Sequence, residues 1–448
     1  MINKVKHILR EKNVSSLFTN IFVAALGLLS FILLTRQLSK EVFGEWVLYV
    51  TLATFVDLLR FGLTQTSSVR LLSGAKKSDH KRLLGSSYKI NIYLFVVVAT
   101  ICWSLHYAVG FFQLNINQGY ALFLFWYPIL SILNLGWNNS MALFQAEQNF
   151  QRMMYVRLSN VGLFVIFLVL NGLYFHFGII EILVAHLGVN LVSTLWCMFK
   201  KWDGSFYLKY ADKKTVNELV SFGKFSMGTL IGSSLLRSSD TFLIGLSPVL
   251  GSSGIAMYAI PLKLTDLLGI PLRSFTMTAY PKMSKKSIEG DLSGVRKTFY
   301  AYSGAITILF IPVAVVCFIF AEELVLILGG QEYVGVLDEL TLIFRIFTLY
   351  TILLPIDRFT GVLLDSINKP QLNLNKVIIM TIANIVVDII AVFVFESLVF
   401  VAVGTVLFTI IGIYLGLYYL KKEIEIKSTR IFPESILFFK NLNIHLTS

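Results

Sequence analysis

Apolar stretches of about 20 residues follow one another along almost the whole chain. Of the 448 residues, 56% are hydrophobic and 14% are charged, whereas soluble domains are about 25% charged. A helix needs about 20 apolar residues to cross the hydrocarbon core of a bilayer. The pattern therefore predicts an all-α polytopic membrane protein.

We expect twelve transmembrane helices, one for each apolar stretch. Their ranges are 15–37, 42–65, 88–112, 119–144, 155–175, 179–199, 219–247, 254–280, 299–320, 338–364, 375–395 and 399–420. The connecting segments are too short for a separate soluble catalytic domain, which needs at least about 50 residues. Each of the three cysteines lies inside an apolar run, which favours packing over a disulfide or metal role.

The basic residues alternate along the chain. The N-terminus, five loops and the C-terminal segment contain 29 of the 38 Lys and Arg residues, whereas the six loops between them contain only Lys40. Lys and Arg concentrate in cytoplasmic loops, so both termini are predicted to be cytoplasmic. The net charge of +12 is then a topology signal, with attraction to anionic lipid as a secondary effect and no role in nucleic-acid binding.

These spans predict two six-helix lobes. We expect a cytoplasmic or interfacial N-terminus (1–14), an N-terminal lobe (15–199), a cytoplasmic linker (200–218), a C-terminal lobe (219–420) and a cytoplasmic tail (421–448). A short internal repeat supports the division: LYVTLATFVDLL contains Tyr49 and Asp57, and MYAIPLKLTDLL contains Tyr258 and Asp266 at the same spacing. Both segments run from outside to inside, as in a parallel repeat. Chance similarity between apolar segments is the alternative.

Five full charges interrupt two apolar stretches in the second half. They lie between Leu235 and Ser274, and each charge near the centre of a membrane span costs about 2.5–3.5 kcal/mol on insertion scales. Such charges persist where they face one another, water or a polar ligand. The sequence therefore predicts a wet, charged cavity, as in a transporter.

Several segments resemble a known family. The segments LLTRQLSKEVFGEWVLYVTLATFVDLLRFGLTQTSSVRLLSG, FGKFSMGTLIGSSLLRSSDTFLIGLSP and YAIPLKLTDLLGIPLRSFTMTAYPKMSKKSIEGDL are similar to the polysaccharide transport proteins. These are the Wzx-type flippases of O-antigen and capsule synthesis, in the MOP superfamily with the MATE exporters and MurJ. MurJ-like members usually have two further C-terminal spans, and this chain has none after Leu420.

The resemblance implies a V-shaped molecule of two lobes, with spans one, two, seven and eight lining a central cavity. It implies a bacterial inner-membrane flippase, not an enzyme, that moves an undecaprenyl-pyrophosphate-linked oligosaccharide to the outer leaflet. Besides that glycan and the bilayer, its partners would include a polysaccharide polymerase and assembly proteins. The expected substrate is an O-antigen, capsule or exopolysaccharide repeat unit.

A pyrophosphate-linked sugar requires cations, and arginine binds phosphate oxygens bidentately. The leading candidates for substrate binding are Arg237, Lys263 and Arg273, followed by Arg60 and Arg345. The alternative is that some of these cations only neutralise acids. Residues three apart share a helix face, and three pairs have this spacing: Arg237 and Asp240, Lys263 and Asp266, Asp57 and Arg60.

The intramembrane acids are candidates for coupling or for charge pairing. Such acids mark ion and proton pathways, and Asp57, Asp240, Asp266 and Asp388 are the members of this group. No Walker motif is present, so we expect no cofactor, with coupling to H⁺, Na⁺ or the membrane potential. No metal site is predicted.

Two other functions compete with the flippase. A MATE-type drug or cation antiporter would favour acids over cations, whereas the region of five charges contains three cations and two acids. A membrane polysaccharide polymerase or glycosyltransferase would be expected to have a large outward loop or an Asp-x-Asp motif, and the chain has neither.

Overall fold

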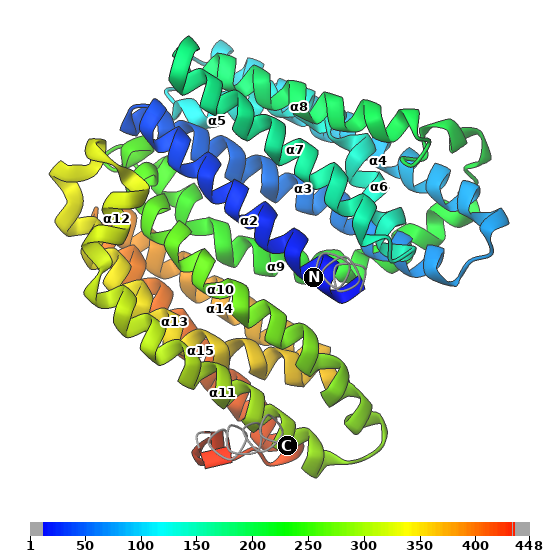
Figure 1. Cartoon of the computed structure of the whole chain (residues 1–448), viewed down its shortest axis with the longest axis vertical. Coiled ribbons are helices and arrows are strands. Elements are labelled where there is room, and N and C mark those ends of the chain that lie inside the picture. The colour runs from blue at the N-terminus through cyan, green and yellow to red at the C-terminus, as the bar shows by residue number, and fades with distance from the viewer. Residues whose placement is uncertain (1–11, 432, 435–448) are drawn as a thin grey trace, which may run out of the picture. The chain divides into compact units, whose positions relative to one another are not determined.

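The regular structure is helical throughout the described part of the chain (Figure 1). The computed structural model describes residues 12–431 and 433–434. Most of the predicted interfacial N-terminus, and the tail beyond residue 434, lie outside these residues. The chain divides into two compact units, Met1–Ser234 and Leu235–Ser448. This division falls inside helix α9, later than the predicted linker at 200–218.

Unit 1 is a bundle in which α3 packs against α4, α5 and α6, α2 against α7, and α8 against α6 and α7. Its helices are α2 (Lys12–Gln37), α3 (Lys40–Gly74), α4 (Lys77–Phe111), α5 (Gln118–Leu133), α6 (Leu135–Ala146), α7 (Phe150–Leu170) and α8 (Ile179–Phe199), with the short π-helix η1 (Asn171–Phe175), the 3₁₀ helix η2 (Ser205–Tyr210) and the first part of α9 (Lys213–Leu246).

Unit 2 is organised around α13, which packs against α10, α11 and α15. Its helices after α9 are α10 (Gly251–Ile288), α11 (Leu292–Ile319), α12 (Ala321–Gly329), α13 (Leu337–Ser366), α14 (Pro370–Phe393) and α15 (Leu398–Ile424), with the short η3 (Gln331–Val336) and η4 (Ser428–Arg430). Phe299, Phe359, Leu363 and Leu420 are fully buried in its main core, so large apolar side chains from α11, α13 and α15 hold this unit together.

Ten of the twelve predicted spans are confirmed as helices long and apolar enough to cross a membrane. Among the described residues, nine single helices meet this description, and the pair α5 and α6 meets it jointly. The other two spans correspond to α2, whose described apolar part is Phe22–Gln37, and to α9, which is not among these helices. The chain is therefore a multi-pass membrane protein.

The fourth predicted span differs from the prediction because it is broken. The sequence predicts one helix over 119–144, but α5 and α6 meet at a bend of 50°. Asn134 stands between them, and Pro128 lies inside α5. Proline cannot donate a backbone hydrogen bond, so the helix is weakened six residues before Asn134.

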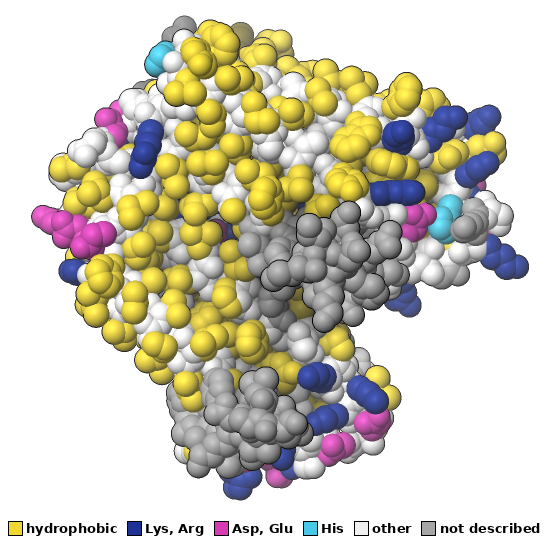
Figure 2. All heavy atoms as spheres, viewed as in Figure 1, with side chains coloured by type: hydrophobic (Ala, Val, Ile, Leu, Met, Phe, Trp, Pro, Cys, Tyr) yellow, Lys and Arg dark blue, Asp and Glu magenta, His cyan; other side chains and the backbone are white. Residues whose placement is uncertain are grey.

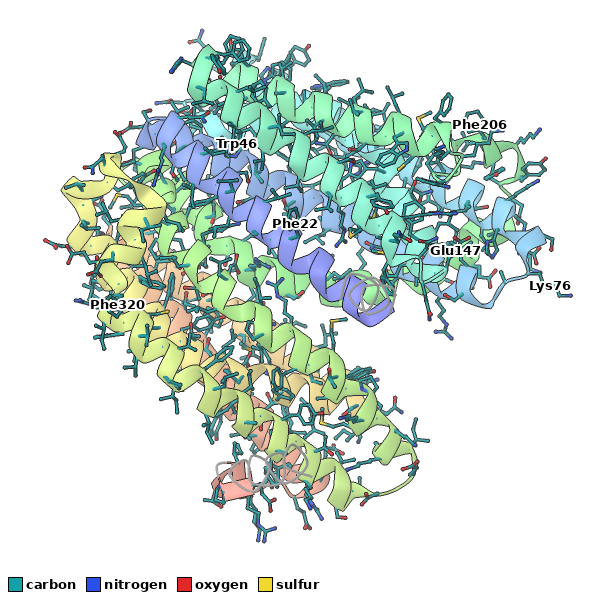
Figure 3. All side chains as sticks on the ribbon, in the orientation of Figure 1. Phe22, Trp46, Lys76, Glu147, Phe206 and Phe320 are labelled. Carbon is teal, nitrogen blue, oxygen red and sulfur yellow. The ribbon has the colours of Figure 1, made fainter. Side chains whose placement is uncertain are left out.

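The segment between α8 and α9 packs onto unit 1. Gly204 has a φ of +95°, a conformation that favours glycine, and η2 contacts α4. A side chain at Gly85 would collide with the carbonyl of Tyr207, so glycine permits this close approach. Phe206 and Lys76 both lie toward the same end of unit 1 (Figure 3).

Hydrophobic side chains cover much of the visible surface of both units, while Lys and Arg gather near the helix ends (Figure 2). Helix α4 is an example, since Tyr93, Ile101, Trp103 and Tyr107 are all exposed. Exposed apolar side chains in this number suit contact with lipid rather than water.

Candidate functional site

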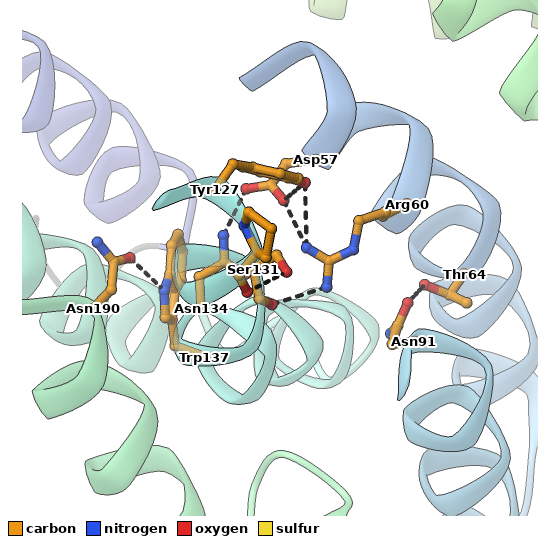
Figure 4. A network of polar contacts seen from close by, with 10 residues as sticks. Asp57, Arg60, Thr64, Asn91, Tyr127, Ser131, Asn134, Trp137 and Asn190 are labelled. Atoms are coloured by element: carbon orange, nitrogen blue, oxygen red, sulfur yellow. Dashed lines mark hydrogen bonds and ion pairs between the residues drawn. The ribbon is translucent and has the colours of Figure 1, made fainter. Parts of the chain in front are cut away.

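A buried charge cluster joins α3 to the broken helix in unit 1 (Figure 4). Asp57 Oδ1 accepts hydrogen bonds from Arg60 Nη1 at 3.0 Å and from the Tyr127 hydroxyl at 2.8 Å. Asp57 Oδ2 accepts from Asn134 Nδ2 at 2.6 Å. Three donors therefore compensate one carboxylate, as burial of a charge requires.

Arg60 also stabilises the break between α5 and α6. Its Nη2 donates to the carbonyl of Ser131 at 2.9 Å, one turn before the bend. Beyond the bend, the Trp137 N–H donates to the Thr194 hydroxyl of α8 at 3.2 Å. Backbone groups released by a helix break need such partners when water is excluded.

Asp57 and Arg60, three residues apart on one helix face, form an ion pair. The Arg60 side chain is only 1% exposed, so the structure places this predicted substrate ligand in the interior of unit 1. Asp57, a predicted coupling residue, is the acceptor at the centre of the same cluster. The arrangement holds α3 and α5 together, and it leaves Arg60 little surface for an external ligand.

Amide side chains of α6 extend the polar interior of unit 1. Asn91 Nδ2 and the Ser87 hydroxyl both donate to Asn139 Oδ1, at 3.2 Å and 2.8 Å, and Asn139 Nδ2 donates to the carbonyl of Asp203. Trp137 Nε1 donates to Asn190 Oδ1 at 3.0 Å. These side chains bond to one another between helices.

An exposed ion pair lies on α9 and α10 in unit 2. Arg237 Nη2 donates to both carboxylate oxygens of Asp266, at 2.9 Å and 2.7 Å. The Arg237 side chain is 59% exposed and that of Asp266 is 38% exposed. Arg237 therefore pairs across helices with Asp266 and not with Asp240 on its own helix, although the sequence spacing pairs Arg237 with Asp240 and Asp266 with Lys263.

Further cations surround this pair. Lys263 lies within electrostatic range of Asp266 and Arg237. Tyr350 of α13 lies within the same range of Arg358, Asp357, Asp266 and Arg237. Arg358 is exposed, whereas Asp357 is buried and pairs with Lys376. We call Arg237, Lys263, Asp266 and Arg358 the cationic patch. It has three cations to one acid, which suits an anionic ligand.

The remaining two predicted ligands lie elsewhere on unit 2. Arg273 is exposed on α10, two turns beyond Asp266. Arg345 Nε donates to the carbonyl of Phe318 at 3.4 Å, and its guanidinium lies 5.3 Å from the centroid of the Phe318 ring. Arg345 thus ties the start of α13 to the end of α11.

A second polar site lies buried between α9, α10, α14 and α15. Asn384 Nδ2 donates to Asp240 Oδ1 at 3.0 Å and to Asp388 Oδ2 at 2.9 Å. The Tyr258 hydroxyl donates to Asp240 Oδ2 at 2.6 Å and lies 3.5 Å from the Thr405 hydroxyl. We call Asp240, Tyr258, Asn384, Asp388 and Thr405 the acidic site.

The acidic site contains oxygen atoms that lack hydrogen-bond partners. Asn384 Oδ1 and Asp388 Oδ1 are both buried and accept no hydrogen bond. Both residues are fully buried. Within the described ranges, no Lys or Arg forms an ion pair with Asp240 or Asp388. Two neighbouring carboxylates and two buried oxygens without partners, one from Asp388 and one from Asn384, suit a proton or a hard cation, which prefers oxygen ligands.

No transition-metal site accompanies these clusters. The described residues contain no group of three or more His, Cys, Asp or Glu side chains that could hold a metal ion.

One buried ion pair is missing from the sequence predictions. Lys376 Nζ lies 2.7 Å from Asp357 Oδ1 and donates to the Thr360 hydroxyl at 2.9 Å. The side chains are 3% and 9% exposed. In the sequence, Lys376 ends a basic segment between two apolar stretches, but the structure places it in α14. It lies eight residues before Asn384 and twelve residues before Asp388. This four-residue periodicity could have identified it.

A model of the polysaccharide biosynthesis protein family matches residues 10–287. No curated protein sequence matches the chain. Two solved structures have a TM-score of 0.73 to this chain. One is a multidrug resistance MATE family transporter of the MOP superfamily in an inward-facing conformation, with 15% identity and coverage of 89% of this chain and 95% of that chain. The other is the lipid II flippase MurJ in an inward closed conformation, with 16% identity and coverage of 97% of this chain and 93% of that chain.

A third similar structure is a MOP superfamily transporter from Pyrococcus furiosus, with a TM-score of 0.64, 14% identity and coverage of 93% of this chain and 95% of that chain. These likenesses show the fold, and the predicted MATE-like and MurJ-like helical architecture is confirmed. The neighbours are transporters and flippases, not enzymes. Because the family model covers more than half of the chain, the chain belongs to the polysaccharide biosynthesis protein family.

Proposed function

We propose that this protein is a flippase of the bacterial inner membrane. It moves an undecaprenyl-pyrophosphate-linked oligosaccharide, an O-antigen, capsule or exopolysaccharide repeat unit, from the cytoplasmic to the outer leaflet by alternating access. The family match and the fold shared with the lipid II flippase MurJ support a lipid-linked glycan as cargo. The basic ends of the spans support a cytoplasmic location for both termini.

The cationic patch is the observation that carries this proposal. Arg237 is exposed in a helix that belongs to a membrane protein, and a bidentate carboxylate holds its guanidinium in place. A guanidinium oriented in this way can bind phosphate oxygens bidentately. The pyrophosphate would compete with Asp266 for Arg237, with Lys263 and Arg358 adding positive charge.

Substitution in the cationic patch tests the proposal. We expect Arg237→Ala to reduce export of surface polysaccharide at least tenfold, because loss of one charge-assisted bidentate contact costs roughly 1.5–3 kcal/mol. Lys263→Ala and Arg358→Ala should each reduce export less. Glu289→Gln, an exposed change on the same unit, is the control. If all three cation variants reach the membrane and export polysaccharide at the wild-type level, the patch does not bind the substrate.

We also propose that the acidic site binds the coupling ion, H⁺ or Na⁺. Asp57 and Asp266 are each held by an arginine. Asp240 and Asp388 instead share the Asn384 amide, and Asp388 Oδ1 is buried without a hydrogen-bond partner. The site therefore supports Asp240 and Asp388, rather than Asp57 and Asp266, as the coupling residues.

Conservative substitutions distinguish coupling from substrate binding. We expect Asp388→Asn and Asp240→Asn to abolish the dependence of export on the sodium or proton gradient while substrate still binds. Arg237→Ala should lower export at every gradient and retain the dependence. Unchanged gradient dependence in both aspartate variants would remove the acidic site from the mechanism.

A drug or cation antiporter is the second candidate function. Its supporting observations are the MATE neighbour and the two buried carboxylates of the acidic site. Drug susceptibility in a sensitive host separates the two functions, because a flippase of lipid-linked glycans should leave susceptibility unchanged.

A further inference from the structure

The connection between α8 and α9 presents lysines and aromatic rings on one exposed surface. We call this the linker surface and define it by Phe199, Lys200, Lys201, Phe206, Lys209 and Tyr210. All six side chains are exposed, and Phe199 is 85% exposed. None of them has a role in the cationic patch or in the acidic site, which belong to unit 2.

The backbone beneath the linker surface is fixed to unit 1. Asn139 donates to the carbonyl of Asp203, and the Trp202 N–H donates to the carbonyl of Cys197 at 3.0 Å. The Tyr207 N–H donates to the carbonyl of Gly204 at 2.9 Å. The lysines and rings are therefore displayed by a folded segment, and a ligand would not have to order it first.

The positive charge of the linker surface is not compensated by neighbouring acids. Asp203 is buried, and its carboxylate accepts from the Ser205 hydroxyl. Asp212 accepts from Thr215 and lies 3.6 Å from Arg82. In the described residues, no ion pair involves Lys200, Lys201 or Lys209.

The lysines lie close to aromatic faces. Lys201 Nζ is 5.7 Å from the ring centroid of Phe206, and Lys209 Nζ is 5.3 Å from that of Tyr210. Aromatic rings with adjacent lysines are typical of the membrane–water interface, where the ring meets the headgroup region and the ammonium reaches the phosphates.

The position of the surface identifies its ligand. Helix α8 is a candidate membrane span that ends at Phe199, so the linker surface begins where the hydrocarbon core ends. Lys76 lies at the same end of unit 1 (Figure 3). We propose that the linker surface binds the headgroups of anionic phospholipids and so anchors unit 1 at the bilayer surface.

Lipid titration of the full-length protein in detergent, followed by native mass spectrometry, tests this proposal. We expect dioctanoyl-phosphatidylglycerol to bind at least tenfold more tightly than dioctanoyl-phosphatidylcholine. The triple variant Lys200→Gln, Lys201→Gln, Lys209→Gln should lose most of that preference, because each lysine near an anionic surface contributes about fivefold. Its binding of phosphatidylcholine should not change.

Two matched variants serve as controls. One removes the same number of charges from another surface, and the other removes apolar contacts from the linker surface. The triple variant Lys421→Gln, Lys427→Gln, Arg430→Gln removes three exposed charges from unit 2 and should retain the preference. The double variant Phe199→Ser, Phe206→Ser should weaken binding of both lipids and retain their ratio. Equal unfolding temperatures in all variants would show that each remains folded.

Three results would overturn the proposal. The first is equal binding of the two lipids by the wild-type protein, and the second is an unchanged preference in the linker variant. The third is an equal loss in the unit 2 control. Binding of a poly-glutamate peptide through the same lysines, without any lipid preference, would replace the lipid with an acidic protein partner.

Discussion

At the scale of single residues, the two aspartates of the internal repeat hold arginines in different ways. Asp57 pairs with Arg60 of the same helix, and the pair lies inside unit 1. Asp266 pairs with Arg237 of a neighbouring helix, and the pair is exposed. The same carboxylate position therefore supports helix packing in one unit and presents a cation in the other.

The buried pair of Lys376 and Asp357 gives a residue-scale prediction for stability. We expect Lys376→Met to destabilise the protein by about 3–5 kcal/mol, because it leaves Asp357 buried without a cation. The double variant Lys376→Met, Asp357→Leu should recover most of this loss, since it leaves no charge unpaired. Thermal unfolding in detergent measures both changes.

The partly exposed pair of Lys369 and Glu423, with an N–O distance of 2.8 Å, is the matched control. Exposed pairs contribute about 0–1 kcal/mol, so Lys369→Met should have little effect. A double variant at Lys376 and Asp357 that is as unstable as the single variant would contradict this interpretation.

Residue-level contacts could be predicted from the sequence only where both partners share a helix. The spacing of Asp57 and Arg60 predicted their pair. The spacing of Arg237 and Asp240 did not, because Asp266 on α10 offers bidentate geometry that depends on the packing of α9 against α10. Lys376 was missed for a related reason, since its partner lies on α13.

At the scale of elements, the break between α5 and α6 has hydrogen-bond partners on both sides. Arg60 binds the carbonyl of Ser131 before it, and Thr194 binds the N–H of Trp137 after it. The broken helix is thus stabilised by α3 and by α8 together.

Loss of one of these partners should destabilise the broken helix. Thr194→Val keeps the side-chain shape and removes the acceptor for the Trp137 N–H, so we expect a loss of about 1–3 kcal/mol in unfolding free energy. Thr100→Val is the control, because the Thr100 hydroxyl bonds only its own helix at Val96 and is exposed. Equal stability of the two variants in a thermal unfolding assay would argue against this role for Thr194.

The linker gives a prediction for pH dependence. Burial raises the pKa of the Asp203 carboxyl, although hydrogen bonds from Ser205 oppose the effect. An acid whose pKa is higher in the folded state loses stability as the pH rises from its unfolded pKa, about 3.9, through its folded pKa. Asp203→Asn removes this titration, so its stability relative to the wild type should increase with pH.

Unfolding temperatures of the wild type and of Asp203→Asn, measured from below the unfolded pKa of about 3.9 up to neutral pH, test this sign. A difference that shrinks as the pH rises would mean that the Asp203 carboxylate is stabilised in the folded protein.

Helix positions followed from the sequence because hydropathy alone determines which segments avoid water. The apolar ranges for α7, α8, α11 and α15 therefore agree with the structure. Hydropathy carries no information on the bend at Asn134, because the sequence on both sides is apolar. It also underestimates the lengths of α3 and α10, whose polar ends remain helical beyond the apolar core.

At the scale of the whole molecule, the chain combines a family match over residues 10–287 with the helical fold of MOP superfamily transporters. The fold class and the family could be predicted from span count and short sequence segments. The site could be predicted only in part, because exposure separates Arg237 from Arg60 and no sequence pattern reports exposure inside a membrane protein.

The central claim is that the protein carries a lipid-linked glycan across the membrane and uses Arg237 to do so. The sidedness of lipid-linked oligosaccharides in spheroplasts, measured with a membrane-impermeant glycan label, tests it most directly. The account predicts labelled glycan in the wild type, and protected glycan that accumulates at the inner leaflet in both the deletion strain and Arg237→Ala. An equal labelled fraction in the wild type and the deletion strain would contradict it.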